Sequence, residues 1–161
     1  MGPLPPSRNG CKCIVVIIDS FSRWVEAIPV TETSATTVTG ILFRHFVSKY
    51  GAPKRIHSAQ GRNLNATVVQ KLFDFCGMRH STSVAYFPQG NGIVERVNKT
   101  LQDVVAKGLD CSMKSNLWDE LLPSAVFAYN TIPHIETGAS HYKMFLDVYL
   151  DSHVVSWTVI E

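Results

Sequence analysis

A glycine-rich loop that runs into a helix carries the residues best suited to chemistry in this chain. The helical pattern begins directly after Gln89-Gly90-Asn91-Gly92. Glu95 falls in the first turn, where the helix dipole favours a negative charge and exposed backbone amides can meet a phosphate. Spacings of three and four residues place Asn98, Lys99 and Gln102 on the same helical face. This set predicts a site for a cation or a phosphate, with an ordinary solvated helix face as the alternative.

Four strand patterns and four helix patterns would have to position this loop. The strands are expected at 12–19, 23–30, 54–58 and 80–85, and the helices at 35–50, 65–76, 93–109 and 118–130. The first strand is a continuous β-branched run, typical of a strand covered on both faces, and its short break predicts an antiparallel hairpin with the second. The inward stripes of two helices include Val68 and Val104. After Thr137 the pattern weakens and predicts no element, so the order indicates an α/β domain with a mixed sheet.

Composition and cysteine usage limit the class of protein. The chain has 161 residues, 45% hydrophobic and 17% charged, with a net charge of +2, which is typical of one globular domain. The four cysteines show no zinc-ligand spacing, and no apolar run is long enough to span a bilayer. These features predict an intracellular protein with free thiols and no membrane association.

Several segments of the chain resemble, in order and spacing, the catalytic core of integrases from gypsy-type LTR retrotransposons and retroviruses. They are the loop and helix at 88–101, the hairpin at 19–29, the stretch 50–63, and the helix from Trp118 to Asn130. The resemblance covers residues 2–142 and predicts a core-like domain over 1–142, followed by a divergent tail, 143–161. It implies an RNase H-like mixed sheet flanked by helices. The family's first strand would lie upstream of Met1, so its neighbours in the sheet should have unpaired edges.

The resemblance also implies a chemistry and shows where this chain departs from it. In the family, two aspartates and a glutamate hold two Mg²⁺ or Mn²⁺ ions that support DNA 3′-end processing and strand transfer. Glu95 matches the last carboxylate, whereas Ala59 falls at the second aspartate, with 35 residues between them. The first aspartate would precede Met1. Asp19 is a weak replacement, and its alternative role is to cap the hairpin turn at Ser22.

Loss of two carboxylates predicts a degenerate site and a pseudoenzyme. Two divalent ions carry about +4, of which Glu95 offsets about one unit, and hard cations need several oxygen ligands. The first interpretation is therefore an inactive integrase core that binds DNA weakly, without sequence preference, and could act in the nucleus. Residues expected to line the DNA-facing surface are Lys54, Arg62, Asn63, Gln89, Asn91, Asn98 and Lys99. The alternatives are a structural module that forms a homodimer, and an active metal-dependent polynucleotidyl transferase that uses Asp19 and Glu95.

Overall fold

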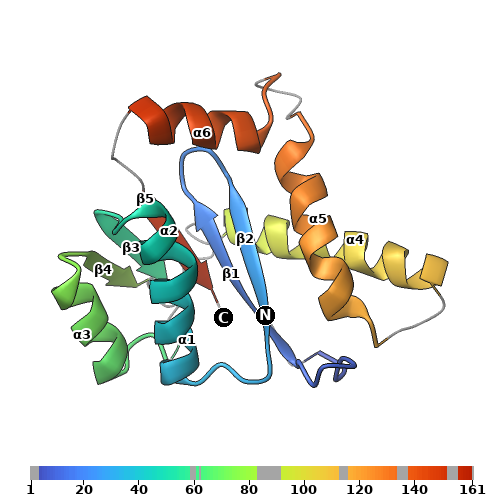
Figure 1. Cartoon of the computed structure of the whole chain (residues 1–161), viewed down its shortest axis with the longest axis horizontal. Coiled ribbons are helices and arrows are strands. Elements are labelled where there is room, and N and C mark those ends of the chain that lie inside the picture. The colour runs from blue at the N-terminus through green and yellow to red at the C-terminus, as the bar shows by residue number, and fades with distance from the viewer. Residues whose placement is uncertain are drawn as a thin grey trace.

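The chain forms one mixed five-stranded sheet with helices on both faces (Figure 1). The computed structural model describes residues 4–58, 61, 63–82, 92–112, 116–133, 138–151 and 156–160. The strands are β1 (Cys13–Asp19), β2 (Val25–Val30), β3 (Arg55–Ser58), β4 (Arg79–Thr82) and β5 (Ser156–Ile160). The helices are α1 (Ala35–Ile41), η1 (Leu42–Val47), α2 (Ser48–Tyr50), α3 (Thr67–Phe75), α4 (Gly92–Ser112), α5 (Trp118–Thr131) and α6 (His141–Asp151). This architecture confirms the α/β fold class expected from the sequence.

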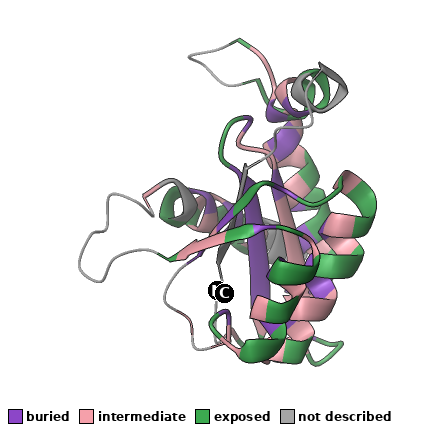
Figure 2. Ribbon diagram, turned by 90° about the vertical axis from the view of Figure 1, so that its left-hand side faces the viewer, coloured by how far each residue is buried: buried purple, intermediate pink, exposed green. Residues whose placement is uncertain are grey.

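Strand β1 divides the core into two clusters, one on each face of the sheet. Ile14, Val16 and Ile18 pack in a cluster with residues of β2, α4 and α5. Val15 and Ile17 face the opposite cluster, to which α1, η1, α3 and α6 contribute. Figure 2 shows this buried strand at the centre of the molecule. The predicted doubly covered strand and its antiparallel hairpin with β2 are both confirmed.

The helices follow the predicted ranges closely, but two side chains do not point inward. α1, η1 and α2 are continuous, and the middle six residues have π-helical geometry. In α3, Val69 is buried and Val68 is 39% exposed. In α4, Leu101 is buried and Val104 is 37% exposed. The prediction that Val68 and Val104 face the core was wrong, because the buried face of each helix is narrower than the stripe of apolar residues in its sequence.

Strand β5 is the main departure from the sequence-based expectation. The strand order is β2-β1-β5-β3-β4, so residues 156–160 lie in the middle of the sheet. β5 pairs antiparallel with β1 and parallel with β3, and Thr158 is the partner of both Ile18 and His57. The edges of β1 and β3 that were expected to be unpaired are therefore paired. β5 has only five residues, which is too short for a clear period, and Thr158 is 140 residues from its partner Ile18 and 101 from its partner His57.

Buried polar contacts fix the N-terminal segment to α5. Ser7 Oγ and Asn9 Nδ2 donate hydrogen bonds to Asp119 Oδ2 at 2.8 and 3.0 Å, and Trp118 Nε1 donates to the Pro5 carbonyl at 2.8 Å. Burial alone would raise the pKa of Asp119, but hydrogen bonds from Ser7, Asn9 and backbone amides outweigh it and lower the pKa below its ordinary value. The carboxylate therefore stays ionised and holds the segment in place.

Helix α6 closes the hairpin end of the sheet. Phe145 stacks on Trp24 with ring centroids 5.1 Å apart and meets Tyr50 edge-on at 5.3 Å. His141 stacks on Tyr129 at 4.9 Å, and its Nδ1–H donates to the Ser22 carbonyl at 2.9 Å. These contacts place the start of the segment 143–161 on the core.

Within the described residues, no helix is both long and apolar enough to cross a membrane.

Candidate functional site

The outward face of α4 presents the polar set that the sequence singled out. Val97 and Leu101 are buried against the sheet, which turns the opposite side of the helix to solvent. Glu95 lies in the first turn and is exposed, as is Lys99. Asn98 is half-buried, and its Oδ1 is buried without a hydrogen-bond partner among the described residues. The Glu95 carboxylate and the Lys99 ammonium group are thus both exposed near the start of α4.

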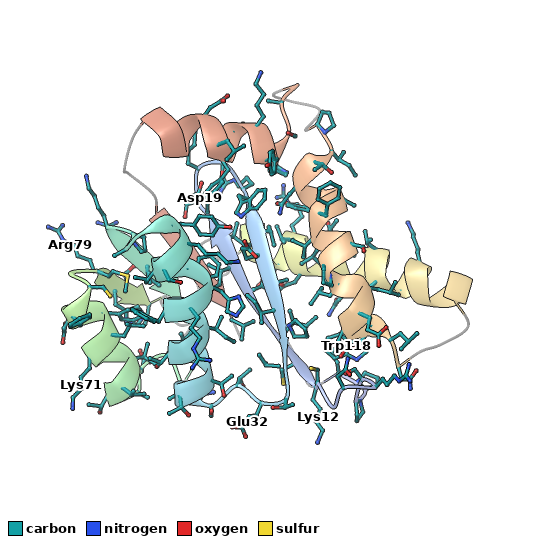
Figure 3. The ribbon with its side chains drawn as sticks, viewed as in Figure 1. Lys12, Asp19, Glu32, Lys71, Arg79 and Trp118 are labelled. Carbon is teal, nitrogen blue, oxygen red and sulfur yellow. The ribbon has the colours of Figure 1, made fainter. Side chains whose placement is uncertain are left out.

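Asp19 is held away from this face by the hairpin turn. Its Oδ2 accepts hydrogen bonds from the Ser22 backbone N–H at 2.7 Å and from Ser22 Oγ at 2.6 Å. Side chains alternate along β1, so Asp19 shares a face with Ile17, whereas Ile18 faces α4. Figure 3 labels Asp19 at the hairpin end of β1, close to α6. The turn-capping role is the one observed, and Asp19 and Glu95 lie on opposite faces of the sheet.

The other expected site residues are only partly brought together. Ala59, Arg62, Gln89 and Asn91 lie outside the described residues. Asn63 is half-buried in the turn before α3, and Lys54 is exposed. Lys54 precedes β3 at the end opposite to Ser58, about 13 Å from it along the strand. Lys54 and Ser58 thus lie at opposite ends of β3, and contact of Lys54 with DNA stays a prediction.

A polar network on β3 and β4 was missed by sequence reasoning. Gln70 Nε2 donates to the Leu64 carbonyl at 3.1 Å and to His80 Nδ1 at 3.0 Å. His80 Nδ1 must then accept, so its Nε2–H donates to Ser58 Oγ at 2.8 Å. Burial, and to a lesser extent the nearby His57, lowers the pKa of His80. The available signal was the presence of polar residues in both short strands, His57 and Ser58 in β3 and His80 and Ser81 in β4, but it does not identify hydrogen-bond partners.

Acidification is expected to destabilise the fold through His80. Because its pKa in the folded state lies below the unfolded value of about 6.5, the stabilisation is complete above that pH and is lost as the pH falls through the folded pKa. Protonated Nδ1 would also face the Gln70 amide donor. Denaturant titrations across this pH range, with an NMR titration of His80, measure the effect. Gln70→Glu, which offers an acceptor, should raise the His80 pKa; an unchanged pKa in that variant would contradict the network.

The family assignment follows from the sequence match once this geometry is known. The sequence profile of the integrase core domain family matches residues 2–88, more than half of the chain. The chain belongs to this integrase core family. It is 31% identical over 144 residues to the Pol polyprotein of transposon 412 from Drosophila melanogaster, covering 89% of the chain and 12% of the polyprotein. It is 35% identical over 140 residues to the koala retrovirus Gag-Pol polyprotein, covering 86% of the chain and 8% of the polyprotein. The chain thus spans a small part of each relative.

Solved structures show the same fold. The catalytic core domain of BIV integrase matches with a TM-score of 0.72 at 24% identity, covering 87% of this chain and 90% of that one. The HTLV-2 integrase catalytic core domain in complex with magnesium, in a trimeric form, matches with a TM-score of 0.68 at 22% identity, covering 81% and 82%. A chain of the simian T-cell lymphotropic virus intasome matches with a TM-score of 0.75 at 21% identity, and the match covers 86% of this chain and 50% of that one. The mixed α/β integrase core fold is thereby confirmed.

The carboxylates of the described residues do not converge on a two-metal site. Glu95 is the acidic residue in the first turn of α4, and Asp19 lies on the other face with one oxygen bonded twice by Ser22. Across the described ranges, no three His, Cys, Asp or Glu side chains converge as a metal-binding group. Hard divalent cations take six or more oxygen ligands, with several anionic. The donors seen here do not fit the metal pair of the family, so no step of catalysis is assigned to it.

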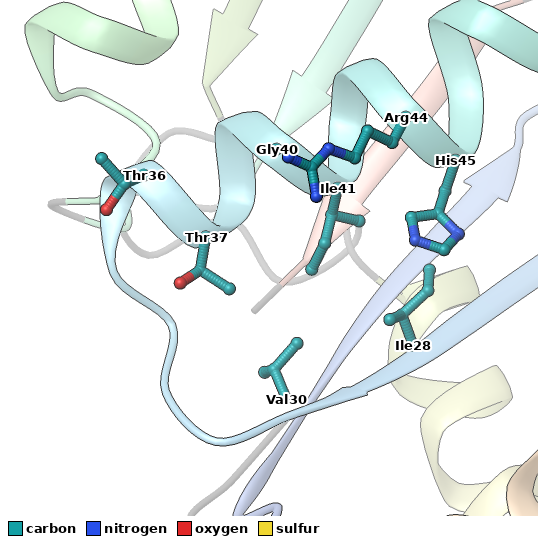
Figure 4. A pocket seen from close by; sticks show the side chains of 8 residues that line it. All are labelled: Ile28, Val30, Thr36, Thr37, Gly40, Ile41, Arg44 and His45. Carbon is teal, nitrogen blue, oxygen red and sulfur yellow. The ribbon is translucent and has the colours of Figure 1, made fainter.

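A cavity elsewhere on the integrase core is separate from this face. It has a volume of about 420 Å³ and lies between β2 and the α1–η1 helix (Figure 4). Its lining residues are Ile28, Val30, Thr36, Thr37, Gly40, Ile41, Arg44 and His45. Ile28 and Val30 belong to the face of the sheet opposite to α4. The cavity therefore takes no part in the surface that carries Glu95.

Proposed function

We propose that this integrase core binds nucleic acid without catalysing strand transfer. The observation that carries the proposal is the position of Asp19, on the face of the sheet opposite to Glu95 and engaged by Ser22. Ala59 supplies a methyl group where the resemblance expects an aspartate. Losing even an outer-sphere partner of a metal lowers affinity or activity about 10–100-fold, so losing direct ligands should abolish metal-dependent chemistry.

A nicking and strand-transfer assay with Mg²⁺ or Mn²⁺ tests the catalytic half of the proposal. The native chain is expected to give no metal-dependent product on duplex DNA. Ala59→Asp should remain inactive and gain only weak Mn²⁺ affinity, measured by calorimetry, because Glu95 and one added carboxylate supply too few oxygen ligands for a metal pair. Glu95→Gln is the matched control and should behave as the native chain does. A metal-dependent product from the native chain that Glu95→Gln abolishes would overturn the proposal.

DNA binding is expected to be weak, sequence-independent and sensitive to salt. Phosphate contacts by Lys and Arg release counterions, so affinity should fall steeply between low and moderate salt. Lys99→Gln on α4 should reduce the slope of log K against log salt by roughly one unit. Fluorescence anisotropy with duplexes of two unrelated sequences measures both effects. Binding that is unchanged over this salt range would contradict the proposal.

Self-association is the second candidate, and exposed apolar side chains on α5 favour it. Phe127 is 67% exposed, and Ile132, which follows the helix, is 63% exposed. Large exposed apolar residues mark association surfaces when they form a patch. A module whose role is structural should show a dimer mass by light scattering and no shift on DNA. Phe127→Ser should then shift the mass toward the monomer, and an unchanged mass would exclude this surface.

A further inference from the structure

Two arginines stand side by side at the start of strands β3 and β4. Arg55 and Arg79 are direct partners in the parallel pairing of these strands, and both side chains are exposed. Partners in register project from the same face of a sheet with their Cβ atoms about 5 Å apart. The Lys54 carbonyl accepts a hydrogen bond from the Arg79 N–H at 3.1 Å, which holds the two strand starts together. Like charges so placed repel each other unless an anion lies between them.

The same face continues with hydrogen-bonding groups. His57 and Ser81 are the next residues on this side of β3 and β4, and His57 Nδ1 lies 3.1 Å from Ser81 Oγ. We use the term basic row for these four residues, Arg55, His57, Arg79 and Ser81. Neither Arg55 nor Arg79 forms an ion pair in the part of the chain that the structure describes. Two unneutralised guanidinium groups beside hydroxyl and imidazole groups suit a phosphate, which Arg can bind through two parallel hydrogen bonds.

The basic row lies on the α4 side of the sheet, but the helices on that side leave it open. The cluster beneath α4 and α5 contains residues of β1 and β2 and, among those described, none of β3 or β4. Figure 3 shows Arg79 pointing outward from β4 at the edge of the molecule. An extended ligand could therefore lie along these strands without displacing a helix.

We propose that the basic row binds the phosphate backbone of a nucleic acid, as a second contact surface in addition to α4. This inference rests on the proposed nucleic-acid binding and adds a surface that the resemblance did not single out. Arg55, at the start of β3, lies about 10 Å along the strand from Ser58. Ser58 is the strand end nearest the predicted carboxylate site. That distance corresponds to roughly three base steps of B-form DNA, so a duplex bound at the basic row could extend to that strand end. Contacts to phosphates carry no sequence information, so binding through the basic row should be sequence-independent.

The test removes each charge and follows DNA binding as a function of salt. Arg55→Gln, Arg79→Gln and the double variant are compared with Lys143→Gln, an exposed lysine on α6. Each single variant should lower the salt slope by about one unit and the affinity several-fold, and the double variant by about two units, because each phosphate contact contributes about 0.9 to the slope. Lys143→Gln should bind as the native chain does. The free double variant should melt no lower than the native protein, since the repulsion is gone.

Inorganic pyrophosphate supplies an independent readout. It should raise the melting temperature of the native chain and leave that of the double variant unchanged. DNA binding with an undiminished slope in the double variant overturns the basic row but leaves the proposed function standing. A native chain that binds no DNA overturns the proposed function; a pyrophosphate shift that still depends on both arginines would then assign the row to a small phosphate compound instead of a nucleic acid.

Discussion

Thr158→Pro should lower the free energy of unfolding of this protein by about 3 kcal/mol or more. β5 has a strand on each side, so the Thr158 N–H points toward β1 or β3 whichever way it faces. Proline removes that donor, and its ring clashes with the neighbouring strand; in a helix interior a comparable insertion costs about 3 kcal/mol or more. Domains of this size are stable by only about 5–15 kcal/mol, so the loss should be a large fraction of the total.

The native sequence supplies a useful contrast within the same sheet. Pro29 lies in β2, which is an edge strand with one neighbour, where proline is tolerated. Circular dichroism with urea titration measures the expected drop in the midpoint, and Thr158→Val is the control, because it keeps a β-branched residue and the backbone donor. An equal urea midpoint for Thr158→Pro and the native chain would show that β5 does not join the two halves of the sheet.

Asn130→Asp should be the second severe change. Asn130 is 1% exposed; its Oδ1 accepts from the Val25 N–H at 2.9 Å, and its Nδ2 donates to the Val25 carbonyl at 2.8 Å. In this way α5 pairs with the backbone of edge strand β2 as another strand would. A carboxylate keeps the acceptor, loses the donor and places a charge in the core, so we expect a loss of about 3–5 kcal/mol.

The pH dependence separates charge from lost packing in this variant. Burial raises the pKa of a carboxyl, and the protonated form regains a donor for the Val25 carbonyl. The destabilisation by Asn130→Asp is therefore greatest above that raised pKa and shrinks as the pH falls, whereas Asn130→Ala should be destabilised by a similar amount throughout. Asn116→Asp, at an exposed position, is the matched control and should be close to neutral. Equal free energies of unfolding for Asn130→Asp and the native chain at neutral pH would exclude the paired hydrogen bonds.

Local patterns in the sequence determined the elements and their types. The β-branched run before Asp19 predicted β1, and the short break after it predicted the hairpin with β2. Glycine and proline near Tyr50 marked the end of the first long helix, and the loop before Glu95 marked the start of α4. These predictions succeeded because periodicity and turn chemistry act over a few consecutive residues. The motifs around Glu95 and Ala59 likewise indicated the integrase core family.

Tertiary pairing decided everything that depends on distant residues. It placed residues 156–160 at the centre of the sheet, turned Asp19 away from Glu95, and brought Arg55 beside Arg79. None of these relations has a local signature, because strand partners, register and the covered face are chosen by the burial of both surfaces of the sheet at once. The sequence by itself therefore identified an integrase core and predicted that Glu95 occupies the position of a family carboxylate. The fold showed that the candidate replacement points the other way, and that the sheet is completed by the chain's own last strand.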